Sequence, residues 1–338
     1  MHCKRLACLT VAALAASAST ALTGTAAAAG SLTGAGSTLV APLEAEWANG
    51  FQSRDGVTVT YNPVGSGTGI KDVSSRLVDF GASDAPMTSA QASACGSCLQ
   101  IPWALSATGV GFHVGGVGNL RLSGSVLAGI YLGQITNWSD SKIKALNKHT
   151  HLPNLRITPI FRSDGSGDTY AFTNYLSHVS SAWARNVGTS TSVGFPHGVG
   201  GKGNSGVTAI LESTNGSIAY VAVSYLIAHS LPAAAVKNAA GKFEYPNLAN
   251  IENAAQSVKH IPSSNALSIV DPSKRSKIAY PISTFTYVIV PRHASQAGLL
   301  KKWILYAMGA GQAFGPGLDF AKIPSIVSKA GKATVGKL

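Results

Sequence analysis

The sequence predicts an α/β fold with mainly parallel sheets, and three segments of the same design carry this prediction. In each segment an extended run passes through a glycine- and serine-rich turn into apolar residues that are spaced to form one face of a helix. Alternation of strand, turn and helix is typical of α/β architectures. The chain has 338 residues, which is enough for two lobes with a core in each.

The three helices follow the turns in GAGSTLVAPLEAEWANGF, in NPVGSGTGIKDV and in FRSDGSGDTYAF. Their predicted apolar faces are Val40, Leu43, Trp47 and Phe51 in the first, Ile70, Val73 and Leu77 in the second, and Phe172, Leu176 and Val179 in the third. Before the second helix, alternating Val57, Val59 and Tyr61 predict a strand. Further along, 217–223 and 282–290 are predicted to be buried strands, 298–308 a helix, and the glycine-rich run 194–206 a long surface loop.

Residues 1–29 have the features of a secretion signal. Basic Lys4 and Arg5 precede an apolar run, and three alanines at 27–29 offer a small-residue cleavage site. No stop-transfer charges follow, and Arg5 stands where a lipoprotein signal has an aliphatic residue. We therefore expect an exported, unanchored chain that begins near Gly30, in the periplasm or outside a one-membrane cell.

The charge balance favours anions. The formal net charge is +12, and loss of the signal would leave +10, because it removes two cations and no acid. Lysine and arginine stand singly rather than in stripes, which argues against nucleic acid. There is no G-x-S-x-G, H-x-x-x-H or D-x-D pattern, so we expect neither an enzyme nor a metal or cofactor.

Two cysteines, Cys95 and Cys98, remain after the predicted signal, in the run CGSC. In a cytosolic redox protein this spacing would indicate catalysis. In an exported chain it favours a local disulfide that staples a loop. We expect the disulfide and assign it no chemistry.

Hydroxyl side chains lie at all three strand-to-helix turns: Ser37 and Thr38, then Ser66, then Ser166. One such residue is ordinarily a helix cap. Glycine-rich turns at three helix starts can also hold a small oxyanion through backbone N–H groups. Arg162, in the third turn, adds a planar fork that suits phosphate or carboxylate.

Asp84, in VDFGASDAPM, follows a short apolar strand and is predicted at its carboxyl end, where open α/β sheets place their ligands. In an anion site a carboxylate accepts a hydrogen bond only from a ligand that still carries a proton. Hydrogen phosphate supplies that proton near neutral pH and sulfate does not. Arg162 and Asp84 together therefore favour a protonated oxyanion.

An ordered set of runs over nearly the whole mature chain resembles the substrate-binding protein of the high-affinity phosphate ABC transporter, the PstS family. The runs are SLTGAGSTLVAPL, NPVGSGTGIKDV, VDFGASDAPM, IYLGQITNW, FRSDGSGDTYAFTNYL, WARNVGTSTSV, GVGGKGNSGV, GSIAYV and YPISTFTYVIV. The resemblance implies a monomer that binds inorganic phosphate outside the cytoplasm and delivers it to the membrane permease subunits of an ABC importer.

The resemblance also implies a type II periplasmic-binding-protein fold, in which two α/β lobes close over the anion about a hinge. Lobe 1 would comprise residues 30–113 and 283–338, and lobe 2 residues 114–282. The implied phosphate contacts are Thr38, the backbone of Leu39, Ser66, Asp84, Arg162, Ser166, Gly167 and Asp168. Asp84 would accept the proton of the ligand, and Asp84 and Asp164 would orient Arg162.

Two positions depart from the family pattern. Leu39 stands where the family often has Phe, and Asp168 where it usually has Thr. Asp168 could be a first-turn acid that is stabilised by the helix dipole and turned outward. Alternatively, it faces the ligand as a second acceptor and favours a more protonated phosphate. In a third alternative, the neighbouring Thr169 supplies the missing hydroxyl. Binding of another protonated oxyanion, or a phosphate-sensing role, also stays open at this point.

Overall fold

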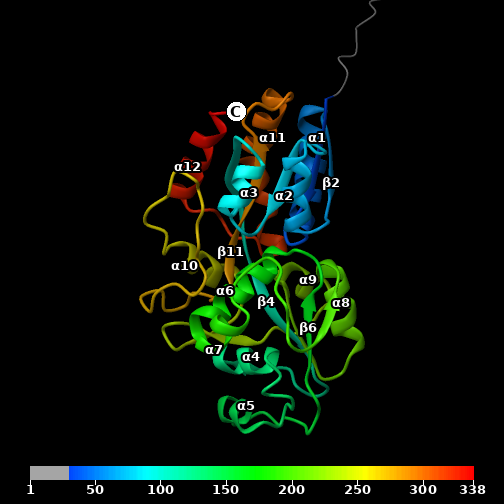
Figure 1. Cartoon of the computed structure of the whole chain (residues 1–338), viewed down its shortest axis with the longest axis vertical. Helices are drawn as coiled ribbons and strands as arrows, with labels where there is room; N and C mark the ends of the chain where they lie inside the picture. The colour runs from blue at the N-terminus through cyan, green and yellow to red at the C-terminus, as the bar shows by residue number, and fades with distance from the viewer. Residues whose placement is uncertain (1–29) are drawn as a thin grey trace, which may run out of the picture.

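The computed structural model describes residues 30–338, so the expected signal segment lies outside the described residues. The chain forms two α/β lobes, one above the other in Figure 1. The first and last parts of the described chain build the upper lobe, and the middle part builds the lower lobe. The α/β prediction is therefore confirmed.

The upper lobe contains β1 (Ser31–Gly36), α1 (Ala41–Asp55), β2 (Thr58–Asn62), α2 (Ser66–Ser74), β3 (Phe80–Ser83), α3 (Ser89–Ala94), β11 (Ser283–Pro291), α11 (Ala297–Ala307), two short 3₁₀ helices (Ala310–Phe314 and Pro316–Leu318) and α12 (Ser325–Val335). The lower lobe contains β5 (Arg121–Leu122), α4 (Gly124–Tyr131), α5 (Ser141–Leu146), β6 (Thr158–Arg162), α6 (Gly167–Val179), α7 (Ser181–Asn186), β7 (Val199–Gly201), α8 (Gly203–Ser213), β8 (Ser217–Ala222), α9 (Val223–Ala228), β9 (Ala235–Lys237), β10 (Phe243–Glu244) and α10 (Leu248–Ala255).

One long strand, β4 (Cys98–His113), joins the lobes. It lies inside an eight-stranded sheet of order β2-β1-β3-β11-β4-β8-β6-β7. Its first part, up to Ala107, pairs with β11, and its second part, from Thr108, pairs with β8. The pairing therefore changes partner at Ala107–Thr108, where the chain passes from one lobe to the other.

The strand directions bring strand ends from both lobes to one place. β1 and β3 are parallel, whereas three antiparallel pairings in succession separate β3 from β8, which is parallel to β6. As a result β6 runs opposite to β1 and β3. The carboxyl ends of β1 and β3 and that of β6 therefore point at the junction between the lobes, where α/β sheets carry their ligand loops.

Most predicted elements are confirmed within a few residues, but two expectations are wrong. In the run 194–206, β7 pairs in parallel with β6, and α8 begins at Gly203. The open edge of β6 overrides the loop-like composition of the run. Leu77 does not extend the second helix: α2 ends at Ser74, Arg76 adopts a left-handed φ of 60°, and the Leu77 side chain is 72% exposed.

An aromatic cluster fills the upper core. The ring of Trp103 lies 5.1 Å from that of Trp47 and 6.2 Å from that of Trp303, both edge to face. All three tryptophans are buried. Such pairs add about 0.5–1.5 kcal/mol each beyond the burial of their area. They fix α1 and α11 against β4 and so hold the loop at the start of α1 in place.

Glu44 is an exception in this core. It lies in α1, is fully buried, and neither carboxylate oxygen has a hydrogen-bond partner among the described residues. Burial raises the pKa of Glu44 well above its usual value. The pKa of Glu44 is therefore higher in the folded chain than in the unfolded chain. The contribution of Glu44 to stability is most favourable below its pKa in the unfolded chain, and it is lost as the pH rises from there toward its pKa in the folded chain.

We predict that Glu44→Met raises the free energy of unfolding at about pH 8 by roughly 1–3 kcal/mol, because no charge then has to be buried or neutralised. The gain should be smaller at about pH 4, where Glu44 is protonated in both states. Urea unfolding followed by tryptophan fluorescence measures both values. Glu46→Met, on the exposed face of the same helix, is the control. An equal gain at both pH values would contradict the argument.

Candidate anion site between the lobes

The predicted site residues lie together at the junction of the lobes. Thr38, Leu39, Ser66, Asp84, Arg162, Ser166, Gly167, Asp168 and Thr169 are all buried, and Asp164 is partly buried. Hydrogen bonds cross directly between the lobes here: Gly167 N donates to Ser66 Oγ (3.1 Å) and Gly67 N to Gly165 O (3.0 Å). Asn204 donates to Thr38 Oγ1 through both Nδ2 (2.8 Å) and its backbone N–H (3.3 Å). The turns that were predicted separately therefore form one site.

Glycine at 167 is required by this contact. A Cβ at Gly167 would lie 2.4 Å from Cβ of Asp84, much closer than two carbon atoms can approach. The start of α6 therefore rests directly on Asp84 across the junction. Backbone N–H groups at a helix start carry partial positive charge, so this position suits an anion.

The loop after β1 is organised by Ser37. The Ser37 hydroxyl accepts a hydrogen bond from Leu39 N (3.0 Å) and donates to Asp84 Oδ2 (2.5 Å). In this structure the N–H of Leu39 is therefore bonded to a side chain. Thr38 turns toward the other lobe, where its hydroxyl accepts from Asn204.

Asp84 lies immediately after β3, as predicted, and is 1% exposed. Thr286 Oγ1 donates to its Oδ1 (2.6 Å), and Ser66 Oγ donates more weakly to its Oδ2 (3.4 Å). Burial, and next the negative charge of Asp168, raise the pKa of Asp84 to about 7, against the hydrogen bonds from Ser37 and Thr286 and the charge of Arg162. Asp84 therefore exchanges a proton near neutral pH.

Arg162 ends β6 and is held by two carboxylates. Its Nε donates to Asp164 Oδ1 (2.8 Å), its Nη2 to Asp164 Oδ2 (2.5 Å), and its Nη1 to Asp168 Oδ2 (3.0 Å). Burial lowers the pKa of the guanidinium, but the hydrogen bond to Asp164 and the charges of Asp168 and Asp164 raise it by more. The net effect is a raised pKa, so Arg162 stays charged. This bidentate contact is consistent with the expected role of Asp164 in orienting Arg162. Asp168, rather than Asp84, is the second hydrogen-bond partner.

Two N–H groups of Arg162 have no protein acceptor among the described residues. A guanidinium has about five N–H groups, of which three are used by Asp164 and Asp168. The other two have no acceptor among the described residues. Burial raises the pKa of Asp164, but the hydrogen bonds from Arg162 outweigh it and hold that pKa below its usual range, so this partner stays ionised.

Asp168 points inward, so the outward-facing alternative is wrong. Its side chain is fully buried and accepts hydrogen bonds from Thr108 Oγ1 (2.7 Å), Arg162 Nη1 and Asn204 Nδ2 (2.9 Å). These donors offset the cost of burying a carboxylate, and a solvent-facing orientation would lose all three. Burial still raises the pKa of Asp168, against the opposing effects of Arg162, Thr108 and Asn204.

Ser166 and Thr169 support the start of α6. Ser166 is the N-cap, and its hydroxyl accepts from Thr169 N (3.4 Å). The Thr169 hydroxyl is bonded to the hydroxyl of Tyr220 (2.8 Å), which also accepts the N–H of Arg162 (2.9 Å). Thr169 is therefore turned toward Tyr220 and supplies no free hydroxyl to the junction.

Four residues that complete this network were not singled out from the sequence: Thr108, Asn204, Tyr220 and Thr286. Ser37 was named as a turn hydroxyl but not as one of the implied phosphate contacts, and it bonds to Asp84. Thr108 and Thr286 lie in buried strands, where an isolated hydroxyl needs a partner. A hydroxyl residue within an apolar run is a feature that the sequence itself shows. Asn204 lies in the first turn of α8, inside the run 194–206 that was predicted as loop.

The arrangement suits reversible binding of a protonated oxyanion. It offers two guanidinium N–H groups, hydroxyls and a helix start as donors, and a carboxyl group, Asp84, as acceptor of a ligand proton. Among the described residues, no group of three or more His, Cys, Asp or Glu side chains is placed to hold a metal ion. No helix in the same part of the chain is long and apolar enough to cross a membrane.

Comparison with known proteins agrees with this chemistry. A PBP superfamily domain matches residues 21–310. The phosphate-binding protein PstS of Xylella fastidiosa is 35% identical over 274 residues, which cover 80% of this chain and 74% of that protein. PstS of Pasteurella multocida is 34% identical over 301 residues, which cover 88% and 87%. The chain belongs to the PstS family of phosphate-binding proteins.

Solved structures share the fold of this PstS family member. A high-affinity periplasmic phosphate-binding protein, PfluDING, bound with phosphate, has a TM-score of 0.73 at 22% identity, covering 90% of this chain and 93% of its own. A putative phosphate ABC transporter substrate-binding protein from Clostridium perfringens has a TM-score of 0.65 at 19% identity, covering 87% and 100%. The predicted two-lobed periplasmic-binding-protein fold is therefore confirmed.

We predict that Tyr220→Phe lowers the free energy of unfolding by about 1–3 kcal/mol, because it leaves the buried N–H of Arg162 without an acceptor. Urea unfolding with tryptophan fluorescence measures the change. Tyr306→Phe is the control, because the Tyr306 hydroxyl has no hydrogen-bond partner among the described residues and should change stability by less than about 0.5 kcal/mol. Equal effects of the two variants would mean that the hydroxyl of Tyr220 does not support Arg162.

Proposed function

We propose that this chain captures inorganic phosphate outside the cytoplasm and delivers it to the permease of an ABC importer. The observation that carries the proposal is the pair of groups at the junction: a buried guanidinium with two unused N–H groups, and the buried carboxyl group of Asp84 with a pKa of about 7. Together they suit an anion that still carries a proton. Phosphate has that property near neutral pH and sulfate does not.

In the proposed complex the phosphate lies between the lobes. Arg162 and the start of α6 at Ser166 and Gly167 donate to its oxygens from the lower lobe, and Thr38, the backbone of Leu39 and Ser66 donate from the upper lobe. On binding, Leu39 N, Gly167 N and Ser66 Oγ exchange their present acceptors, Ser37, Ser66 and Asp84, for phosphate oxygens. Asp84 accepts its proton. These fixed donors replace the hydration shell of the ion without covalent chemistry, which is why we propose a binding protein rather than an enzyme.

Release would require the lobes to separate. β4 runs from the upper lobe into the lower lobe, and the chain returns to the upper lobe at the start of β11. Thr108 N, where β4 changes partner, donates to Ile282 O, just before β11 (2.9 Å). We place the hinge in these segments, with 30–113 and 283–338 as lobe 1 and 114–282 as lobe 2. A cavity of about 230 Å³ lies beside Thr38 and Asp164 and is lined from both lobes.

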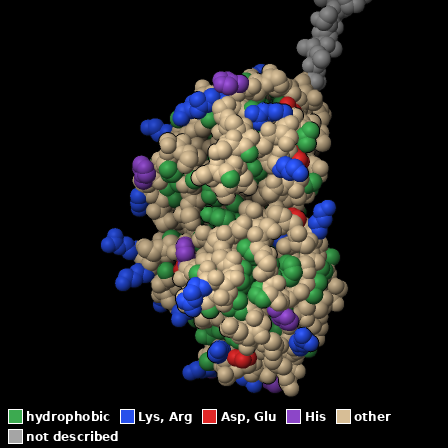
Figure 2. Space-filling view, in the orientation of Figure 1, with side chains coloured by type: hydrophobic (Ala, Val, Ile, Leu, Met, Phe, Trp, Pro, Cys, Tyr) green, Lys and Arg blue, Asp and Glu red, His purple; other side chains and the backbone are tan. Residues whose placement is uncertain are grey.

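The charged surface suits attraction of anions without a dedicated patch. Figure 2 shows lysine and arginine side chains scattered singly over one face, with few acids among them. A net positive charge speeds encounter with phosphate but gives no selectivity. The scattered pattern on this face supports a small anion rather than nucleic acid as the ligand.

We propose that the chain acts as a monomer, in the periplasm or outside a one-membrane cell.

We expect calorimetric titration of the ligand-stripped chain from Gly30 to show tight phosphate binding at about pH 5 and weaker binding at about pH 8, with no sulfate heat at about pH 8, where Asp84 is ionised. Hydrogen phosphate brings one proton for Asp84 at both pH values, and the buried, acid-rich site favours one proton more, held by the ligand as dihydrogen phosphate or by Asp84. At about pH 8 both groups have lost this second proton in the free state. It must then be taken up from solution, so the dissociation constant rises by up to about tenfold per pH unit. Absence of phosphate binding at both values would refute the proposed function.

Asp168→Thr tests the role of the extra carboxylate. It removes a negative charge from beside Arg162, so we expect phosphate to bind at least about tenfold more tightly than to the wild type at about pH 8, with a shallower pH dependence. Calorimetry over a pH series measures this. Asp55→Asn, at the distant end of α1, makes the same change in net charge and should have no such effect. An unchanged pH profile in Asp168→Thr would show that Asp168 only positions Arg162.

Asp84→Asn should weaken discrimination between the two anions. The amide places donors where the carboxylate accepted the ligand proton, so sulfate no longer faces a buried negative acceptor. We expect the ratio of sulfate to phosphate affinity to rise by at least about tenfold. Competition of sulfate against phosphate measures the ratio, again with Asp55→Asn as control. A ratio unchanged from the wild type would remove Asp84 as the selectivity residue.

A further inference from the structure

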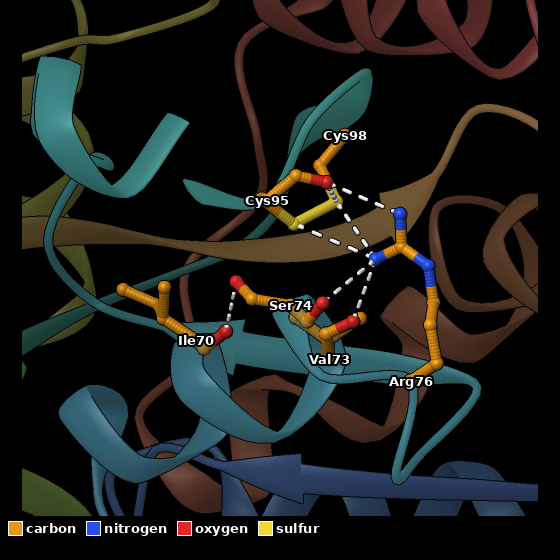
Figure 3. Close-up of a disulfide and its surroundings, with 6 residues drawn as sticks. All are labelled: Ile70, Val73, Ser74, Arg76, Cys95 and Cys98. Atoms are coloured by element: carbon orange, nitrogen blue, oxygen red, sulfur yellow. Dashed lines mark hydrogen bonds between the residues drawn. A yellow bond between two sulfur atoms is a disulfide. The ribbon is translucent and has the colours of Figure 1, made fainter. Parts of the chain in front are cut away.

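A disulfide on the upper lobe lies next to a guanidinium. Cys95, just after α3, is bonded to Cys98, the first residue of β4, which confirms the predicted pairing. Nη1 of Arg76 lies 3.9 Å from Cys95 Sγ and 3.7 Å from Cys98 Sγ. Figure 3 shows the guanidinium beside the disulfide. A permanent positive charge therefore lies within contact distance of both sulfur atoms.

The position of this guanidinium is fixed by hydrogen bonds. Nη1 of Arg76 donates to the carbonyl of Val73 (2.8 Å), and Nη2 donates to the carbonyl of Cys95 (3.1 Å). The first carbonyl lies in the last turn of α2 and the second directly after α3. Arg76 also has a left-handed φ of 60°, in the turn where the chain leaves α2. The cation is thus placed at the disulfide by groups other than the sulfur atoms.

The two cysteine residues differ in accessibility. Cys95 is 2% exposed, whereas Cys98 is only partly buried, and the intervening Gly96 and Ser97 are exposed. The short helix α3 has no buried residues, so the segment that carries Cys95 lies at the surface. A thiol that approaches from solvent therefore reaches Cys98 first.

We propose that Cys95–Cys98 is a thiol–disulfide exchange site for small thiols, with Arg76 as its activating cation. A thiolate from solvent attacks Cys98 Sγ, the bond between Cys98 and Cys95 breaks, and its electron pair leaves on Cys95 Sγ. The products are a mixed disulfide at Cys98 and the Cys95 thiolate beside Arg76. A second thiolate that attacks the small-molecule sulfur of the mixed disulfide releases the oxidised small thiol and leaves Cys98 as a thiolate. Two electrons then have passed from two thiols to the protein.

Arg76 supplies what this position otherwise lacks. Cys95 lies at the carboxyl end of α3, where the helix dipole disfavours a negative sulfur. A cation at contact distance reverses this preference, stabilises the thiolate and makes it a better leaving group. The spacing C-x-x-C is compatible with this chemistry, and the structure adds the cation that the sequence did not connect with it.

The test is equilibration of the chain from Gly30 with mixtures of reduced and oxidised glutathione, at low salt because Arg76 is exposed. Arg76→Gln should lower the equilibrium constant for reduction about tenfold relative to the wild type, whereas Arg76→Lys should retain most of the wild-type value. Arg54→Gln, an exposed arginine of α1, is the matched control for net charge. Equal constants in the wild type and Arg76→Gln would overturn the proposal.

A measurement on the wild type alone keeps the test independent of variant folding. The rate of iodoacetamide alkylation of the reduced chain, followed against pH, gives the thiol pKa values. The proposal requires at least one thiol to titrate clearly below the free-cysteine value of about 8.5, and to move toward it at high salt. Two thiols that titrate at or above that value would refute the proposal, and the disulfide would then be a structural staple.

Discussion

The buried guanidinium of Arg162 is the charge on which the arrangement of the site depends. It lies between Asp164 and Asp168, and each carboxylate is bonded in turn to a different part of the chain: Asp164 to the backbone N–H of Gly203, and Asp168 to Thr108 and Asn204. Removal of either carboxylate would leave a buried charge or buried donors unpaired. The free-energy cost of such an unpaired group is much larger than the net stability that the intact pair contributes. The same pairing leaves two N–H groups unused, so the contacts that stabilise Arg162 also orient it for an anion.

Selectivity in this account comes from an excess of negative charge. One guanidinium faces three carboxyl groups, Asp84, Asp164 and Asp168, so a further fully ionised anion is repelled unless protons come with it. The high pKa of Asp84 and the raised pKa of Asp168 have the same cause, burial, and both groups are coupled to Arg162 through their charges. Protonation of the ligand, charge of the site and closure of the lobes are thus one equilibrium, and pH acts on all three together.

Much of this could be predicted from the sequence, because the signals were local. A glycine-rich turn before a helix face predicts an anion-binding helix start, and an acid after a short apolar strand lies at the carboxyl end of a sheet. The orientation of Asp168 could not be predicted, because it depends on Thr108, 60 residues away, and Asn204, 36 residues away. Thr286 donates to Asp84 across 202 residues. Likewise, β7 exists because β6 offers it an edge, which the glycine-rich composition of that run does not reveal.

The most direct test of the central claim is a crystal structure of the chain from Gly30 grown with phosphate. We predict one tetrahedral anion between the lobes, within hydrogen-bond distance of the two free N–H groups of Arg162, of Ser66 and of the start of α6, with one oxygen directed at the carboxyl group of Asp84. Phosphate found elsewhere, or Arg162 bonded to Asp164 and Asp168 with no anion at the junction, would contradict the account.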